Sequence, residues 1–159
     1  MITERELRFM TMAVEQSRYG MENGFGGPFG CIVVKGDEVI ATGFNKVAST
    51  NDPTAHAEVV AIRNACAALN TFQLTDCEIY TSCEPCPMCL GAIYWARPKI
   101  VYYANSKVDA AAIGFDDQFI YEELAIPMHE RQLPMVPIFV DDAICVFNDW
   151  HTKEDKTKY

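Results

Sequence analysis

Four residues in two short segments have the types and the spacing needed to hold a metal ion and move a proton. His56 and Glu58 form an H-x-E segment, and Cys86 and Cys89 form the P-C-x-x-C segment that follows. One imidazole and two thiolates supply three ligands for Zn²⁺ and leave the fourth tetrahedral position for water. Zinc lowers the pKa of that water to near neutrality, and Glu58 can accept its proton. The two segments therefore predict a hydrolytic site.

Both segments are expected at the N-terminal ends of helices. Apolar residues at helical spacing predict a helix over 55–69, so that the H-x-E segment falls in its first turn. A second helix is predicted over 88–96, after a short buried strand at 77–82. The cysteine pair then lies at a helix N-terminus, where the pKa of a thiol is lowered. Two helix ends would thus face one metal ion.

The remaining elements must position these two helix ends. A capping-box pattern at Thr3 and Glu6 predicts a helix over 3–19, and the next segments predict a hairpin of 29–35 with 38–44. Further along the chain, we expect a strand over 99–104, a short edge strand within 125–140 and a last helix over 142–156. Strands that alternate with helices indicate right-handed parallel crossovers. The fold class is therefore α/β: a three-layer α/β/α sandwich whose mixed sheet has about five strands.

Length, charge and cysteine content limit the function classes. The chain has 159 residues, which fits a single domain over 1–159. A net charge of −9 disfavours a nucleic-acid partner, because its phosphates are also negative, and favours a small, roughly neutral substrate. No signal-peptide pattern or membrane-length apolar run is present. Seven cysteines, an odd number, argue against a disulfide framework and indicate the reducing cytoplasm.

Cys83 leaves open a different use of the metal. With Cys86 and Cys89 it forms C-x₂-C-x₂-C, the beginning of an iron–sulfur run, but that run needs a further cysteine where Ile93 stands. A closed site with three cysteines and His56 is the stronger rival. Such a site would make the protein a zinc-stapled interaction module and not an enzyme. The position of Cys83 at the end of a predicted strand favours a role outside the metal ligands.

Four stretches resemble the guanine deaminase branch of the cytidine deaminase superfamily. Three of them, 26–30, 51–58 and 80–96, carry the G-G-P-F-G, H-A-E and P-C-P-M-C patterns. The last two patterns are shared with tRNA adenosine deaminases, so they identify the chemistry and not the base. The stretch 112–121, with G-F-D-D-Q-F, is more selective and is similar to bacterial guanine deaminases. The resemblance implies hydrolytic deamination of guanine to xanthine and ammonia.

The resemblance also implies a role for each residue of the reacting centre. His56, Cys86 and Cys89 match the ligands of one Zn²⁺ per chain. Glu58 matches the glutamate that shuttles protons, and Asp117 matches the acid that recognises the exocyclic amino group and helps to protonate it as it leaves.

Further positions match residues that bind the purine substrate. Asn45 corresponds to an asparagine that hydrogen-bonds the base, and Phe29 to an aromatic ring that stacks on it. The backbone N–H of Ala57 corresponds to the group that holds the polar edge of the ring. Trp95 occupies the place of an aromatic pocket wall.

The resemblance implies a homodimer whose C-terminal segment, 141–159, is exchanged between subunits. Tyr159 would then close the pocket of the partner. Other amino-substituted rings, such as guanosine, isocytosine or an aminotriazine, are alternative substrates for the same pocket. Adenosine in tRNA is a further alternative, against which the acidic net charge argues.

Overall fold

The computed structural model describes residues 2–115 and 117–159. Its helices are α1 (Glu4–Glu22), α2 (Val47–Thr50), α3 (Ala57–Leu69), α4 (Pro87–Ala96), α5 (Lys107–Ala112), α6 (Asp117–Ala125) and α7 (Asp141–Thr152), with a 3₁₀ turn η1 (Met128–Glu130); its strands are β1 (Gly30–Lys35), β2 (Glu38–Phe44), β3 (Cys77–Cys83) and β4 (Ile100–Asn105). No helix in the described part of the chain combines the length and the apolar character that crossing a membrane requires.

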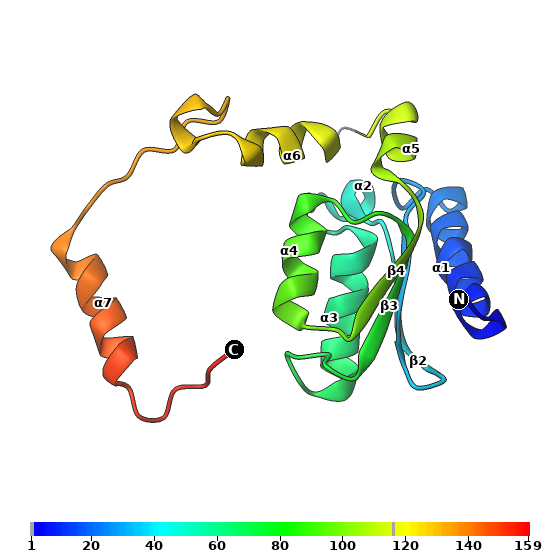
Figure 1. Ribbon diagram of the computed structural model, residues 1–159, viewed down its shortest axis with the longest axis horizontal. Coiled ribbons are helices and arrows are strands. Elements are labelled where there is room, and N and C mark those ends of the chain that lie inside the picture. Colours follow the sequence, from blue (N-terminus) through cyan, green and yellow to red (C-terminus); the bar gives the residue numbers. More distant parts are fainter. Residues whose placement is uncertain (1, 116) are drawn as a thin grey trace. The chain divides into compact units, whose positions relative to one another are not determined.

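The chain divides into two compact units, one that ends at Ile120 and one that comprises Tyr121–Tyr159. The first unit contains the sheet, whose strand order is β2-β1-β3-β4. Strand β1 is antiparallel to β2 and β3, whereas β3 and β4 are parallel. Helix α1 covers one face of this mixed sheet, and α3 and α4 cover the other (Figure 1). The predicted three-layer sandwich is therefore confirmed.

The number of strands differs from the sequence-based expectation. About five strands were expected, and the described residues form four. The missing one is the edge strand expected within 125–140, where the structure has η1 followed by an extended segment without ladder hydrogen bonds. Pro134 and Pro137 in this segment have no backbone N–H to donate to a neighbouring strand, which disfavours ladder pairing.

Alternation along the central strands separates the two layers of the core. Ile32, Val34 and Tyr80 pack with Phe9 and Ala13 of α1 in one buried cluster. The intervening side chains of β1 and β3 point to the opposite face and pack against α3 and α4: Cys31, Val33 and Ile79. Because successive side chains of a strand point to opposite faces, a fully buried central strand supplies both layers.

Glycines let the helices lie close to the sheet. A Cβ atom on Gly43 of β2 would lie 2.6 Å from the backbone nitrogen of Ala61 and would also meet the carbonyl oxygen of Ala57, both in α3. Such approaches are far below ordinary van der Waals contact, so only glycine fits there. This contact fixes the height of the α3 N-terminus against the sheet, and that N-terminus carries the H-x-E segment.

Candidate metal centre and active site

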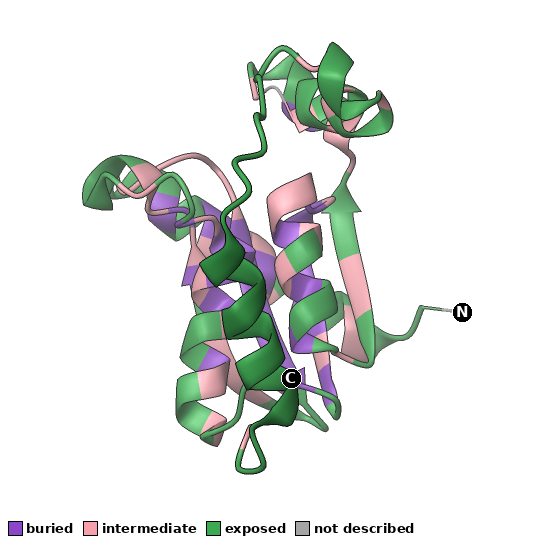
Figure 2. Ribbon diagram, turned by 90° about the vertical axis from the view of Figure 1, so that its left-hand side faces the viewer, coloured by how far each residue is buried: buried purple, intermediate pink, exposed green. Residues whose placement is uncertain are grey.

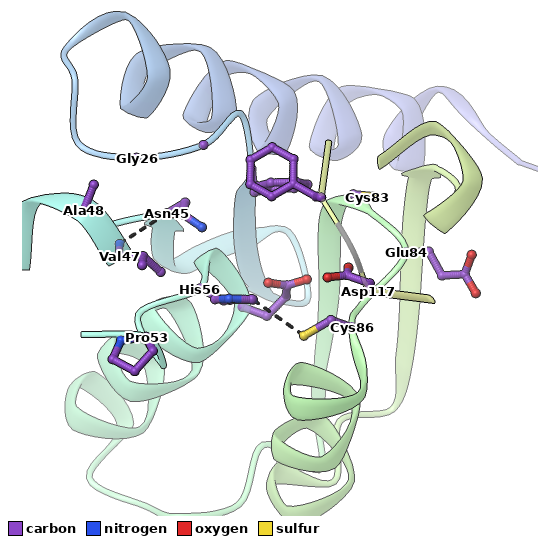
Figure 3. A pocket seen from close by; sticks show the side chains of 14 residues that line it. Gly26, Asn45, Val47, Ala48, Pro53, His56, Cys83, Glu84, Cys86 and Asp117 are labelled. Atoms are coloured by element: carbon purple, nitrogen blue, oxygen red, sulfur yellow. Dashed lines mark hydrogen bonds between the residues drawn. The ribbon is translucent and has the colours of Figure 1, made fainter. Parts of the chain in front are cut away.

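The three residues predicted to bind metal meet between the N-terminal ends of α3 and α4. His56 is the N-cap of α3, and Cys86 is the N-cap of α4, with Cys89 in its first turn. The imidazole Nδ1 of His56 lies 3.5 Å from the Sγ of Cys86 (Figure 3). One potential ligand atom from each of the three residues lies within 4.8 Å of the others. The structure therefore brings together all three predicted ligands.

The spacing and the chemistry of these donors fit Zn²⁺. Ligand atoms on a tetrahedral zinc ion, with Zn–N of about 2.0 Å and Zn–S of about 2.3 Å, are separated by roughly 3.6 Å. Hydrogen bonding from the Cys89 thiol and from His56 lowers the pKa of Cys86 to about 4 despite its burial. The same contact with Cys86, together with burial, raises the pKa of Cys89. A divalent cation would remove this conflict, because it stabilises both thiolates at once.

Cys83 is set apart from the metal ligands. It ends β3, and its Sγ lies 3.6 Å from the carbonyl oxygen of Ser106, to which the thiol donates. Burial raises the pKa of Cys83 to about 11. Among the described residues, it does not join the group of potential ligand atoms formed by His56, Cys86 and Cys89. This arrangement favours an open, three-residue site over the closed four-residue alternative.

Glu58 lies in the first turn of α3 and is only 6 % exposed. The hydroxyl of Thr81, on β3, donates a hydrogen bond of 3.2 Å to its Oε1. Burial raises the pKa of Glu58 above its ordinary value. A carboxyl group whose pKa moves toward neutrality can both accept and return a proton, which is the requirement for a general acid–base. Sequence reasoning missed Thr81, although a polar residue in a buried strand was a usable signal.

Two of the three metal ligands, His56 and Cys86, border a pocket of about 450 Å³. Its lining residues come from the glycine-rich loop between α1 and β1 (residues 23–29), the α2 region, both helix ends and the segment after α5: Gly26, Gly27, Phe29, Asn45, Val47, Ala48, Pro53, His56, Glu58, Cys83, Glu84, Cys86, Phe115 and Asp117 (Figure 3). This volume lies in the range of small-molecule sites, roughly 300–1,000 Å³. Of these residues, Phe115 is the aromatic one to which sequence reasoning gave no role.

The predicted substrate-binding residues near the first strand lie in or beside this pocket. Asn45 is buried, its backbone N–H donates to the carbonyl of Phe29, and its Oδ1 accepts from the N–H of Val47 at 3.1 Å. A Cβ atom on Gly26 would collide with Asn45, so this glycine makes room for the amide side chain. Ala57 is the first residue of α3, where backbone N–H groups have no acceptor within the helix.

The remaining predicted site residues lie in different places. Asp117 lines the pocket, whereas Asp116, the other acid of the motif, lies outside the described residues. Trp95 is 63 % exposed on α4 and is not among the residues that line this pocket. Tyr159 belongs to the second unit, where it borders a separate hollow with Phe147 and Trp150 of α7.

Replacing the cysteines one at a time distinguishes the open site from the closed one. Cys86→Ser should abolish stoichiometric zinc, because the smaller and harder hydroxyl is a poor substitute for a thiolate. Cys83→Ser, a matched change three residues away, should retain about one zinc per chain. Metal content of the purified variants by atomic emission measures both. Loss of zinc from both variants would favour the closed four-residue site.

Comparisons with known proteins agree with this geometry. Residues 3–105 match the family described as the cytidine and deoxycytidylate deaminase zinc-binding region. The chain is 52 % identical to the guanine deaminase of Bacillus subtilis (strain 168), over 95 % of this chain and 97 % of that protein. It is 41 % identical to the tRNA-specific adenosine deaminase of Aquifex aeolicus, over 67 % of this chain and 70 % of that one.

Two solved structures extend the comparison to the fold. The crystal structure of guanine deaminase from B. subtilis superposes with a TM-score of 0.94 at 49 % identity and covers 99 % of both chains. Guanine deaminase from Nitrosomonas europaea gives a TM-score of 0.67 at 34 % identity, over 74 % of this chain and 66 % of that one. With its H-x-E and P-C-x-x-C segments joined in one pocket, the chain belongs to the cytidine and deoxycytidylate deaminase family.

Proposed function

We propose that this protein is a zinc-dependent guanine deaminase that hydrolyses guanine to xanthine and ammonia. The observation that carries this proposal is the likeness to the B. subtilis guanine deaminase over 95 % of the chain. The family match ends at residue 105, so it leaves out the segment that contains Phe115 and Asp117. That segment lies within the superposed guanine deaminase structure, which covers 99 % of the chain. The likeness thus includes residues that face the substrate pocket and not only the metal site.

The residues of the pocket supply binding and proton transfer. Zn²⁺ held by His56, Cys86 and Cys89 would supply the Lewis acidity that activates water at neutral pH. Glu58, buried beside these ligands, takes the proton of the attacking water and passes it to a ring nitrogen. A C–O bond forms at C2, the C–N bond to the amino group breaks, and ammonia leaves after protonation by Glu58 or Asp117.

The same pocket orients the base. Phe29 supplies an aromatic face for the purine ring, and the amide of Asn45 supplies a hydrogen-bonding group on a buried side chain. The N–H of Ala57, at the start of α3, can hold a polar ring edge. None of the seven cysteines, all of which the structure describes, forms a disulfide, which fits a reducing compartment such as the cytoplasm.

A panel of substrates tests the proposed reaction. The zinc-loaded protein should release ammonia from guanine with a higher kcat/KM than from guanosine, isocytosine, an aminotriazine or adenosine-containing RNA. RNA is disfavoured because a chain with a net charge of −9 lacks the cationic surface that neutralises phosphates. An enzymatic ammonia assay measures each rate. Faster release from the RNA would identify the protein as a tRNA-type deaminase and contradict the proposal.

A change at Glu58 tests the proton shuttle. Glu58→Gln keeps the shape of the side chain but removes its proton transfer, so kcat should fall by roughly 10²–10⁴-fold. Zinc content and guanine binding should persist, as measured by atomic emission and calorimetry. Glu38→Gln, at the exposed start of β2, is the matched control and should leave kcat unchanged. Near-normal turnover by the Glu58 variant would refute its role.

We also propose that a second copy of the chain covers the C-terminal unit. None of the residues in Tyr121–Tyr159 is buried, and α7 is exposed along its whole length (Figure 2). Large apolar side chains are exposed throughout this unit: Met135, Val136, Ile138, Phe139, Ile144, Phe147 and Trp150. An apolar surface of this extent marks an interaction site. This exposed apolar surface supports a homodimer, because a second copy of the chain would cover it.

The first unit offers a surface on which such a segment could dock. Strand β4 is at the edge of the sheet, with Ile100 and Tyr103 exposed, and α4 exposes Tyr94 and Trp95. The segment 131–140, which precedes α7 and is not helical, could add to this sheet edge through main-chain hydrogen bonds, and α7 would follow it. Exchange of 141–159 between subunits would carry Tyr159 to the partner's pocket.

Complementation between two impaired variants tests the exchange. Tyr159→Ala and Glu58→Gln should each be impaired as homodimers. Unfolded together and refolded with zinc, they should regain activity that neither has alone, because a mixed dimer contains one pocket with both groups intact. The unmixed variants, refolded in the same way, are the control. No gain in a mixture shown to contain heterodimers would contradict closure by the partner.

A further inference from the structure

Phe115 anchors the segment that carries Asp117. Among the described residues of 111–120, only Phe115 and Asp117 are partly buried; the others are exposed. Ile113, two residues before Phe115, is 60 % exposed. The partly buried ring of Phe115 is therefore an apolar contact between this segment and the rest of the first unit.

The phenyl ring of Phe115 is placed by two partners in the glycine-rich loop. Its centroid lies 4.7 Å from that of Phe29, with the ring planes at 88°. This edge-to-face geometry is a favourable arrangement for two aromatic rings. A Cβ atom on Gly27 would lie only 2.7 Å from Cζ of Phe115. The absence of a side chain at position 27 thus makes room for the ring.

A backbone hydrogen bond of Phe115 fixes the turn that precedes Asp117 in the chain. The N–H of Phe115 donates to the carbonyl of Ala110, the buried residue of α5, so the turn after α5 is fixed on one side. Asp117 begins α6 two residues later. It lines the pocket together with Cys86, and Figure 3 labels both side chains. Asp117 therefore shares this pocket with two of the metal ligands, His56 and Cys86.

We infer that Phe115 is a positioning residue that couples substrate stacking to the acid at position 117. Its ring supports Phe29 from the side, and its backbone holds Asp117 at the pocket. This inference rests on the proposed function, in which Phe29 stacks on the purine and Asp117 helps the amino group to leave. Loss of the ring should therefore affect both KM and kcat, through two different residues.

A double-mutant cycle in the zinc-loaded full-length protein separates these two effects. Phe115→Ala should lower kcat for guanine by about 10- to 100-fold, because small displacements of a reacting group cost this much. In the Asp117→Asn background the same change should alter kcat by less than about twofold, since Asp117 no longer contributes. KM should rise in both backgrounds, because the support of Phe29 is lost in both. A merely structural role would not produce this split.

Two further variants keep the test independent of a folding defect. Phe115→Leu preserves an apolar contact with Gly27, so it should restore most of kcat. Gly27→Ala leaves position 115 intact but crowds the rings of Phe115 and, less closely, Phe29, so it should reproduce both the loss of kcat and the rise of KM. Ile113→Ala, in the same turn but exposed, is the control and should leave both constants unchanged. Zinc content and melting temperature establish that each variant is folded, and if Phe115→Ala is not, Gly27→Ala takes its place in the cycle.

The outcomes distinguish the inference from the function on which it rests. An equal loss of kcat with and without the Asp117 carboxylate would overturn the inference, as would full activity of both Phe115→Ala and Gly27→Ala. Those results require that the wild-type protein deaminate guanine. Failure of the wild-type protein to do so would instead overturn the proposed function.

Discussion

The site depends on one electrostatic constraint. Two thiols, an imidazole and a carboxyl group meet in a mostly buried space between two helix ends. The hydrogen bond with Cys86, burial and the charge of Glu58 all raise the pKa of Cys89 and so disfavour a second negative charge there. A divalent ion reverses this balance and makes the cluster favourable. The same divalent ion would thus both stabilise this cluster and supply its chemistry.

The fold satisfies this constraint by controlling how closely two helices approach one sheet. Gly43 allows α3 to lie against β2, and this contact fixes the height of the H-x-E segment. Strand β3 leads directly to the N-terminus of α4, so the end of that strand fixes the position of the cysteine pair. Thr81, on the same strand, holds the carboxylate of Glu58. Strand β3 therefore helps to place two of the three metal ligands, Cys86 and Cys89, and orients the general base.

The pocket above the metal is built by segments that are far apart in the sequence. The glycine-rich loop after α1 contributes Phe29, and the end of β2 contributes Asn45. The turn after α5 contributes Phe115 and Asp117. Two glycines of the loop admit side chains from these other segments, Asn45 at Gly26 and Phe115 at Gly27. Glycine here serves close packing between segments, and the left-handed conformation is not required at either position.

The sequence by itself determined the reacting groups and the layers. The types and spacing of His56, Glu58, Cys86 and Cys89 specify zinc chemistry, and apolar periodicity placed them in the first turns of two helices. These signals are local, since they depend on residues within one or two turns of each other. The number of strands was less secure, because a strand exists only where a neighbour completes its hydrogen bonds, and no periodicity reveals the neighbour.

Only the tertiary structure decided which distant residues meet. Two contacts join residues that are far apart in the sequence: that of Phe115 with Phe29 and the hydrogen bond of Thr81 to Glu58. The structure also separates Cys83 from Cys86 and Cys89, its neighbours in sequence, because its thiol contacts Ser106 instead. Such contacts depend on the closeness of whole elements, which is set by side-chain volume at positions such as Gly27 and Gly43. The physical reason is that spacing along a chain fixes the face of an element, whereas packing between elements fixes what that face touches.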